Sequence, residues 1–502
     1  MKKLLSLSLC LLLTLACTVG LAEAPTPISA ILRLPATFIV EDNPVIKAWG
    51  ERTGVTFEIE APPVSNYSDR LNIVMASGEL PDLIHIQNLN STFQQWARDG
   101  LLLDLTDYFT PEKMPHATSV LTAEELASCY VDGRLYALPR AQAKPYDAII
   151  YRGDWLDKLG LEIPQTAEEF AKVMEAFTTQ DPDGNGQNDT YGFSVRGVTL
   201  EDRNFAHAFG LRPNSIPNAA GEYELMQTQE GYMRLLDWLR GMYENGSLNP
   251  EWYLAQSYED QDMFYAGKIG AVYTDCTINH VITFANNETF KAANPGAYLV
   301  AGPALRPEGT ETVDIYYPPQ VWGAHAANAD SENVEKIIEI LDDGYTNECV
   351  TLLFKGLEGV TYTSLDPETR VITATEEQAA LGNNVYASSY LCINYQLEDK
   401  GIVISGGTAT TPEDTAKWLE ASAYVERIER RVGYLPESAL DGMADETTRL
   451  TNDGTFSELA ERRTQYICGQ ISREEMATYL TEVYAPANEG IMQIIRDSKI
   501  NQ

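Results

Sequence analysis

The pattern of hydrophobic and polar positions predicts alternating strands and helices at the start of the chain. Apolar or alternating runs mark the strands, and apolar stripes with a period near 3.6 residues mark the helices. In chain order the predicted segments are residues 28–34, 43–54, 55–59, 65–76 and 83–86. Strand, helix, strand, helix and strand in succession are typical of a parallel α/β sheet with right-handed crossovers.

The same patterns predict a second lobe and a helical end. Residues 136–139 and 148–151 predict strands that carry the chain into the second lobe, and residues 313–327 predict its return to the first lobe. The remainder of the chain has mostly helical patterns, with one helix predicted over residues 412–431. A chain of 502 residues is also too long for one ordinary core. The expected division is residues 1–24 as a targeting segment, 25–143 with 303–345 as the first lobe, and 144–302 with 346–502 as the second lobe.

The first residues have the pattern of an export signal. Two lysines precede an apolar run over residues 4–16, which is the length of a signal-peptide core. The run ends like a bacterial lipoprotein box, which predicts a lipid on Cys17, although Thr14 stands where leucine is usual. The alternative is ordinary cleavage after Ala22 or Ala24. Either route predicts a protein that is lipid-anchored at the extracellular face of the membrane or secreted.

Charge and composition exclude several classes of function. The net charge of −37 makes nucleic acid and anionic lipid headgroups poor partners. The seven cysteines and five histidines are dispersed without CxxC or zinc-like spacing, so we expect neither a disulfide framework nor a zinc site. No nucleophile-elbow or zinc-protease motif occurs, and no pair among the 73 acidic residues stands in a catalytic pattern. We therefore do not expect an enzyme.

One loop has the spacing of a calcium site. Side-chain oxygens occupy its positions 1, 3, 5 and 9, a glycine occupies position 6, and a backbone carbonyl points inward at position 7. The expected ligands are Asp181, Asp183, Asn185, Gln187 and Asp189. Position 12 is Gly192 instead of glutamate, so the last ligand would come from Thr190, water or a distant carboxylate. The alternative is a metal-free surface turn rich in Asp, Asn and Gly.

The neighbours of this loop give calcium a structural role. Before it, Thr166 and Glu169 form the pattern of a capping box that opens a helix with an apolar face. After it, residues 191–195 predict a short strand. Calcium would therefore staple a helix to a strand, which is a structural and not a catalytic task.

Short motifs along the chain resemble one bacterial family in their order. They are residues 49–55 (WGERTGV), 77–83 (SGELPDL), 99–105 (DGLLLDL), 136–139 (YALP), 154–160 (DWLDKLG), 266–271 (AGKIGA) and 356–363 (GLEGVTYT), with the 181–192 loop among them. Together with the lipobox-like start, the set resembles the bacterial extracellular solute-binding proteins of family 1, and is similar to alginate-binding proteins with the same type of calcium loop. Only residues 373–407 resemble nothing in the family.

The resemblance implies a periplasmic-binding-protein fold with two α/β lobes, a hinge and a ligand cleft between the lobes. It also implies a monomer that binds an oligosaccharide and delivers it to the permease of an ABC importer. Two alternatives stay open. One is a peptide or other solute binder or adhesin on the same fold, and the other is a secreted glycosidase or lyase that uses paired carboxylates.

The candidate ligand residues lie where strands of open α/β sheets end. They are Glu41, Asn43, Gln87, Asn88, Arg140, Tyr146, Arg196, Trp252, Tyr253, Asp275, Tyr317 and Trp322. Aromatic rings suit the apolar faces of sugars, and polar groups suit their hydroxyl edges. Arg140 or Arg196 would suit the carboxylate of a uronate through two parallel hydrogen bonds. For each aromatic residue the alternative is a place in the core, and Asn43 also serves as a helix N-cap.

Overall fold

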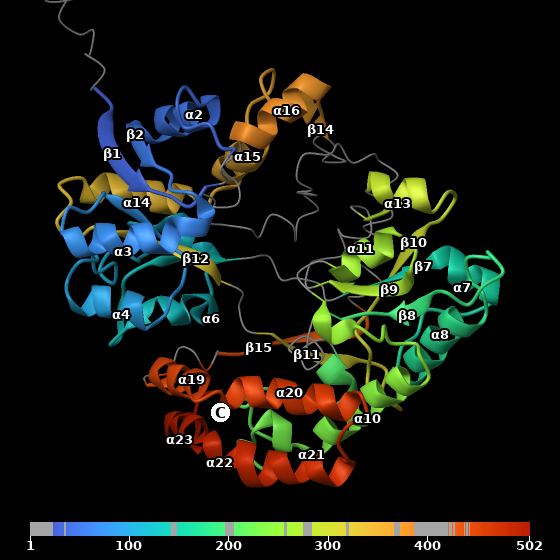
Figure 1. Cartoon of the computed structure of the whole chain (residues 1–502). Coiled ribbons are helices and arrows are strands. Elements are labelled where there is room, and N and C mark those ends of the chain that lie inside the picture. Colours follow the sequence, from blue (N-terminus) through green and yellow to red (C-terminus); the bar gives the residue numbers. More distant parts are fainter. Residues whose placement is uncertain are drawn as a thin grey trace, which may run out of the picture.

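The protein has two α/β lobes and a C-terminal group of helices (Figure 1). The computed structural model describes residues 24–34, 37–141, 148–195, 205–255, 259–274, 284–317, 321–365, 372–385, 427–435 and 442–501, with residues 420, 424, 437 and 440. No helix in these ranges combines the length and the apolar character needed to cross a membrane.

The first lobe is built on a five-stranded sheet in the order β2-β1-β3-β12-β6. The strands are β1 (Thr26–Ile31), β2 (Val55–Glu60), β3 (Leu83–Ile86), β6 (Leu138–Ala141) and β12 (Val321–Ala327). β1 runs parallel to β2 and β3, whereas β12 is antiparallel to β3 and β6. The predicted parallel start is therefore confirmed, with the first strand placed slightly earlier than residues 28–34.

Helices cover both faces of this sheet (Figure 1). They are α2 (Pro44–Thr53), α3 (Tyr67–Ser77), α4 (Ser91–Arg98), α5 (Pro115–Val120), α6 (Ala123–Leu126) and α14 (Val334–Asp343). Two further helices of this lobe, α15 (Asn347–Lys355) and α16 (Glu376–Val385), lie next to each other beyond α2 (Figure 1). α2 shows how local sequence sets the boundaries. Asn43 accepts hydrogen bonds from the N–H groups of Val45 and Ile46, and Gly54 ends the helix at a φ of 71°.

The first core takes in more of the chain than the sequence predicted. Cys349, Leu353 and Val385 are buried in this core, although the expected boundary assigned residues after 345 to the second lobe. The reason is that α15 packs against α2, and their apolar faces cover each other.

The second lobe holds a four-stranded sheet in the order β10-β7-β9-β8. Its strands are β7 (Ala148–Arg152), β8 (Tyr191–Phe193), β9 (Ile269–Thr274) and β10 (Leu299–Gly302), and its helices are α7 (Gly153–Leu159), α8 (Ala167–Thr179), α10 (Glu230–Glu244), α11 (Glu259–Tyr265) and α13 (Glu288–Ala293). β8 ends at Phe193, two residues before the predicted end. As predicted, α8 turns Phe170, Val173, Met174 and Phe177 into the core.

The C-terminal helices complete the core of the second lobe. They are α19 (Met443–Asn452), α20 (Thr455–Ile467), α21 (Arg473–Tyr479), α22 (Ala485–Ala487) and α23 (Glu489–Ser498). Leu450 and Leu459 belong to the same buried cluster as Trp155 and Phe170. The predicted helix-rich end is confirmed for this part of the chain.

A small parallel sheet lies outside both large sheets. β11 (Val313–Tyr317) pairs with β15 (Glu429–Gly433), and we call these two strands the crossing pair. Two predictions are corrected here. Of residues 313–327 only β12 joins the first sheet, and the helix predicted over residues 412–431 is wrong at its end, where β15 begins. The pairing buries Val313 and Ile315, although the sequence pattern predicted that these residues belong to the first lobe.

Candidate functional site

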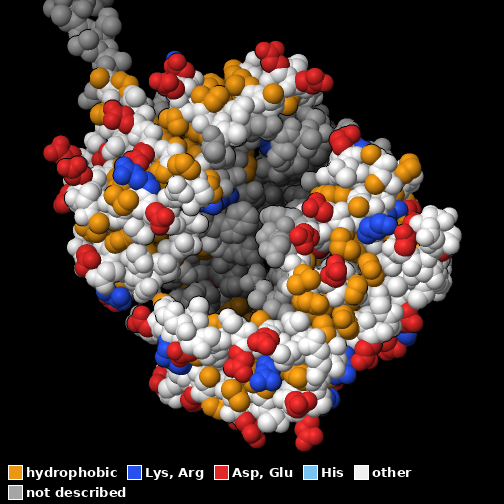
Figure 2. Space-filling model, in the orientation of Figure 1, with side chains coloured by type: hydrophobic (Ala, Val, Ile, Leu, Met, Phe, Trp, Pro, Cys, Tyr) orange, Lys and Arg blue, Asp and Glu red, His pale blue; other side chains and the backbone are white. Residues whose placement is uncertain are grey.

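The carboxyl ends of strands from both lobes face one gap. In the first sheet β1, β3 and β6 end on the same edge, because β3 and β6 are each antiparallel to β12. In the second sheet β8 and β9 end where β7 begins, since Thr274 pairs with Ala148. Only residues 142–147 join the end of β6 to the start of β7, so these two edges are held close together. Figure 2 shows the molecule hollowed between the lobes.

The predicted ligand residues of the first lobe lie at or near this edge. Gln87 and Asn88 directly follow β3, and Glu41 is exposed in the loop before α2. Arg140 stands on β6 but is only 3% exposed. Asn43 is also buried, and its amide nitrogen donates to the carbonyls of Ile39 and Val385. Its side chain therefore holds the fold in this structure.

The remaining predicted ligand residues are placed less completely. Trp252 is 1% exposed in the core of the second lobe, whereas the neighbouring Tyr253 is 42% exposed. Tyr317 stands at the end of β11 and Trp322 in β12, but their side chains are not described. Tyr146, Arg196 and Asp275 lie outside the described residues.

A buried histidine pair lies beneath the first-lobe edge. His85 on β3 pairs in register with His325 on β12, and their ring centroids are 5.1 Å apart. Gly323 makes room for this contact, because a Cβ at its φ of 102° would lie 2.9 Å from the His85 ring. Burial, and then the neighbouring His325, Arg140 and Arg33, hold the pKa of His85 well below its usual value. His85 is therefore held neutral beneath this edge.

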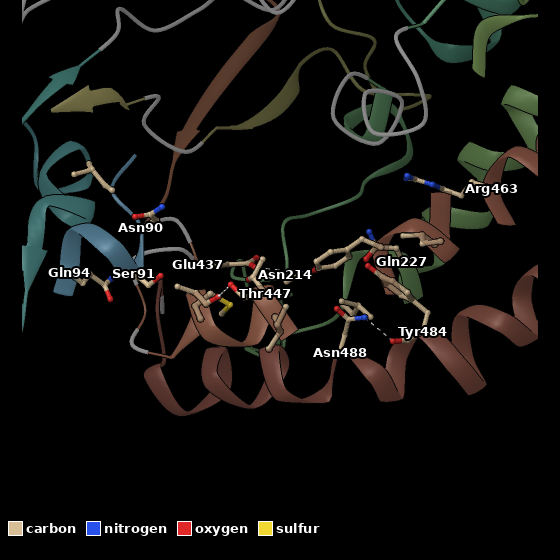
Figure 3. A pocket seen from close by; sticks show the side chains of 18 residues that line it. Asn90, Ser91, Gln94, Asn214, Gln227, Glu437, Thr447, Arg463, Tyr484 and Asn488 are labelled. Carbon is tan, nitrogen blue, oxygen red and sulfur yellow. Dashed lines mark hydrogen bonds between the residues drawn. The ribbon is translucent and has the colours of Figure 1, made fainter. Parts of the chain in front are cut away.

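A cavity of about 720 Å³ joins the first lobe to the C-terminal helices (Figure 3). We call it the interlobe pocket. The first lobe contributes Asn90, Ser91 and Gln94, at the start of α4. The second lobe and the C-terminal helices contribute Asn214, Gln227, Glu437, Thr447, Arg463 and Asn488. Apolar side chains, including those of Leu225, Phe456 and Leu459, line the rest. Apolar surface with a few polar groups is what a small-molecule site requires.

Sequence reasoning missed this pocket. None of the predicted ligand residues that the structure describes lines it, although Gln87 and Asn88 lead directly into Leu89, which does. The prediction considered only the ends of strands, whereas most of the lining comes from loops and C-terminal helices. The one local signal was the N-cap pattern of Asn90 before α4.

The predicted calcium loop, residues 181–192, has several side-chain oxygens close together in this structure. Asp181 Oδ1 is buried without a hydrogen-bond donor, and Asp181 Oδ2 accepts from the N–H of Gly186 at 3.1 Å. The amide nitrogen of Asn185 donates to both Asp183 and Asp189, at 2.9 Å each. Gln187 donates its N–H to Asn185 Oδ1 at 2.7 Å. The all-oxygen donor set suits a hard cation, and the buried oxygen of Asp181 fits that role.

Other contacts restrict this loop. Lys268 pairs with Asp189 at 3.1 Å, and Lys158 donates to the carbonyl of Asp181. The hydroxyl of Thr190 is buried and donates to the carbonyl of Phe177, so Thr190 ties the loop to α8. No group of three or more His, Cys, Asp or Glu side chains is arranged around a metal position in the described ranges.

Gly192 explains the missing glutamate at position 12. A Cβ there would lie 2.5 Å from the Cβ of Met174 and 2.7 Å from its backbone. The strand after the loop packs directly on α8, and only glycine fits the contact.

The curated relatives include a bacterial lipoprotein and bacterial proteins named for the sugars that they bind. The chain is 27% identical to the lipoprotein LipO of Bacillus subtilis over 64% of each chain. It is 24% identical to the polygalacturonan/rhamnogalacturonan-binding protein YtcQ of the same species over 66% of each. It is 29% identical to the fructooligosaccharide ABC transporter substrate-binding protein FusA of Streptococcus pneumoniae over 37% of this chain and 38% of that one. Each match covers less than two thirds of the relative.

Solved structures share the fold over nearly the whole chain. An HMO-binding, ABC-transporter-associated solute-binding protein of Bifidobacterium longum infantis has a TM-score of 0.66 at 17% identity, covering 95% of this chain and 99% of that one. The alginate-binding protein AlgQ2 without calcium ion has a TM-score of 0.64 at 19% identity, and the match covers 95% of this chain and 98% of that one. An EF-hand mutant of the pneumococcal FusA in complex with fructo-nystose has a TM-score of 0.63 at 18% identity, and the match covers 94% of this chain and 99% of that one. These likenesses confirm the predicted periplasmic-binding-protein fold.

The family model described as bacterial extracellular solute-binding protein matches residues 40–342, which is more than half of the chain. The match confirms the resemblance seen in the ordered motifs, and it confirms that the chain is not an enzyme. The protein therefore belongs to the bacterial extracellular solute-binding proteins, which bind their solutes without transforming them.

Proposed function

We propose that the protein is the extracellular substrate-binding component of an ABC importer and that it binds an oligosaccharide between its lobes. The main support for the proposal is the lining of the interlobe pocket. Amide and hydroxyl side chains from both lobes lie there beside apolar side chains. Sugars present hydroxyl edges and apolar ring faces, so this lining matches them. Relatives named for galacturonan and for fructooligosaccharide support the same ligand class.

The sheet edges would extend the site beyond the pocket. Gln87 and Asn88 lie beside it in the chain, and the exposed ring of Tyr253 offers a surface for a sugar ring. Arg140, Arg196 and the other predicted residues remain proposals for the ligand site. The bound sugar would pass to a permease in the membrane, with the protein acting as a monomer held by a lipid on Cys17.

Binding of one sugar class is the direct test. The purified protein is titrated with neutral and uronate oligosaccharides, and its melting temperature and the stoichiometry are measured. A ligand that binds only the folded state stabilises it by about 2.7 kcal/mol at a hundred times its Kd. We expect a saturable rise with one class, one ligand per chain and no cleavage products. No rise with any oligosaccharide would contradict the proposal and favour a peptide or other solute.

We also propose that the 181–192 loop holds one structural calcium ion. The two relatives whose names mention calcium or an EF-hand support this, as does the buried oxygen of Asp181. The ligands would be Asp181, Asp183, Asn185, Asp189 and the carbonyl of Gln187. Bound calcium would replace the hydrogen bonds within the loop and fix the end of α8 against β8.

Chelation is expected to lower the melting temperature without abolishing sugar binding. Saturating calcium should restore about 2–3 kcal/mol, because the ion binds the folded loop. Asp181→Asn should remove this response, whereas Asp107→Asn, at a side chain 85% exposed elsewhere, should keep it. Loss of sugar affinity on chelation, in a protein that stays folded, would contradict a purely structural role.

A further inference from the structure

Glu437 brings a carboxylate into the wall of the interlobe pocket (Figure 3). Its Oε1 accepts from the N–H of Ser215 at 3.1 Å, and its Oε2 lies 3.5 Å from the amide nitrogen of Asn214. Burial raises the pKa of Glu437, while the bonds from Asn214 and Ser215 act in the opposite direction. These bonds fix the carboxylate in place and leave acceptor capacity on its oxygens.

A second acceptor in the same wall has no donor. The amide oxygen of Gln227 is buried and receives no hydrogen bond. A buried acceptor of this kind is costly unless a ligand supplies a donor. Sugar hydroxyls can donate, whereas an ionised carboxylate can only accept. The two acceptors therefore match neutral sugar edges.

The described lining holds one cation that could face a uronate. Glu437 and Arg463 are its only charged side chains. Arg463 is 3% exposed, its Nη1 lies 3.4 Å from the hydroxyl of Tyr232, and Figure 3 shows it well apart from Glu437. The start of α4 faces the pocket, but Asn90 already accepts from the N–H groups of Thr92 and Phe93. Those two N–H groups are satisfied by the Asn90 side chain and are not offered to an anion.

We propose that the interlobe pocket selects neutral oligosaccharides over uronates and that Glu437 is the residue that discriminates. The inference rests on the oligosaccharide function proposed above and adds the substrate class. It separates this protein from relatives named for polygalacturonan and alginate. A uronate in the pocket would place one carboxylate against another, whereas a neutral sugar would donate hydroxyls to Glu437.

The test compares neutral and charged trisaccharides by calorimetry. The protein is titrated separately with three neutral trisaccharides (galactotriose, maltotriose and kestose) and with two charged ones (trigalacturonate and trimannuronate). The pH is about 8, which is above the ordinary range of carboxyl pKa values. We expect one neutral trisaccharide to bind at least about tenfold more tightly than either uronate, the size of an uncompensated like-charge contact. Glu437→Gln keeps the shape of the side chain and removes its charge. It should therefore lower the ratio of neutral to uronate affinity by about tenfold.

A matched variant separates the pocket from the general charge of the protein. Glu482→Gln makes the same change at an exposed residue outside the lining, and it should leave the ratio unchanged. A uronate that binds as tightly as any neutral sugar, or equal effects of the two variants, would overturn the inference and leave the oligosaccharide function standing. Absence of binding by all five trisaccharides would overturn both.

Discussion

Gly192→Glu is expected to destabilise the second lobe by about 3 kcal/mol or more and not to complete the calcium loop. The loop pattern alone suggests the opposite, because glutamate at position 12 is the usual bidentate ligand. In this structure a Cβ at residue 192 would meet Met174 at 2.5 Å and its backbone at 2.7 Å. A backbone contact of this kind cannot be relieved by a side-chain rotation, so β8 and α8 would have to separate.

Thermal unfolding with and without calcium measures this effect. The melting temperature should fall by roughly 5–10 °C in both conditions. Gly241→Glu is the matched control, since that glycine is exposed in α10 and a Cβ there meets no atom within 4 Å. It should be neutral or slightly stabilising, because glutamate is the better helix former by about 0.5–1 kcal/mol. A Gly192→Glu protein with tighter calcium binding and unchanged stability would show that the loop, and not the packing, governs this position.

Acidification below about pH 6.5 is expected to weaken the first lobe through His85. Burial and the nearby positive charges lower the pKa of His85 in the folded protein. Below the pKa of the unfolded chain, the unfolded state therefore binds a proton at His85 that the folded state does not bind. The stability that His85 contributes is therefore complete above that value and is lost as pH falls. The loss from this one residue approaches about 1.4 kcal/mol for each pH unit, down to the folded pKa.

Denaturant unfolding at several pH values between about 7.5 and 5 tests this prediction, because carboxylates ionised in both states contribute little there. His85→Gln should be less stable than the native protein at neutral pH but should show a flatter pH dependence below about 6.5. His116→Gln is the control, since His116 is exposed on α5 and should leave the slope unchanged. An identical slope in the His85 variant would locate the acid sensitivity elsewhere.

Local signals in the sequence were sufficient for much of the fold. Asn43 with Pro44 opens α2, Gly54 ends it, and the apolar run of residues 83–86 is β3 without any shift. Caps, glycines and alternation act over a few residues, so they can be recognised in one sequence. The ordered motifs then allowed the family to be identified.

Features that depend on distant contacts could not be found in this way. Nothing near residues 429–433 indicates a strand, because that strand exists through its pairing with β11. Gln227 stands in a short 3-10 helix (Met226–Thr228) and Glu437 stands outside the long helices and strands, and only packing of the C-terminal helices near α4 brings them close to Asn90. The candidate ligand residues follow the ends of strands, whereas the interlobe pocket is lined mainly by loops and C-terminal helices beside the edge where those strands end.

The crossing pair also sets the order in which the exported chain can finish folding. β11 precedes the segment that returns to the first lobe, and β15 follows it, so the two lobes are interleaved along the chain. When the chain emerges N-terminus first, β1, β2 and β3 are available early. The first sheet is complete only when β12 inserts between β3 and β6. The second core waits longer still, for α19 to α23. Such long-range closure is slow and leaves strand edges open meanwhile. Completion of the second core therefore depends on α19 to α23, and a chain truncated before α19 is expected to remain an aggregation-prone intermediate rather than to fold as a smaller binding protein.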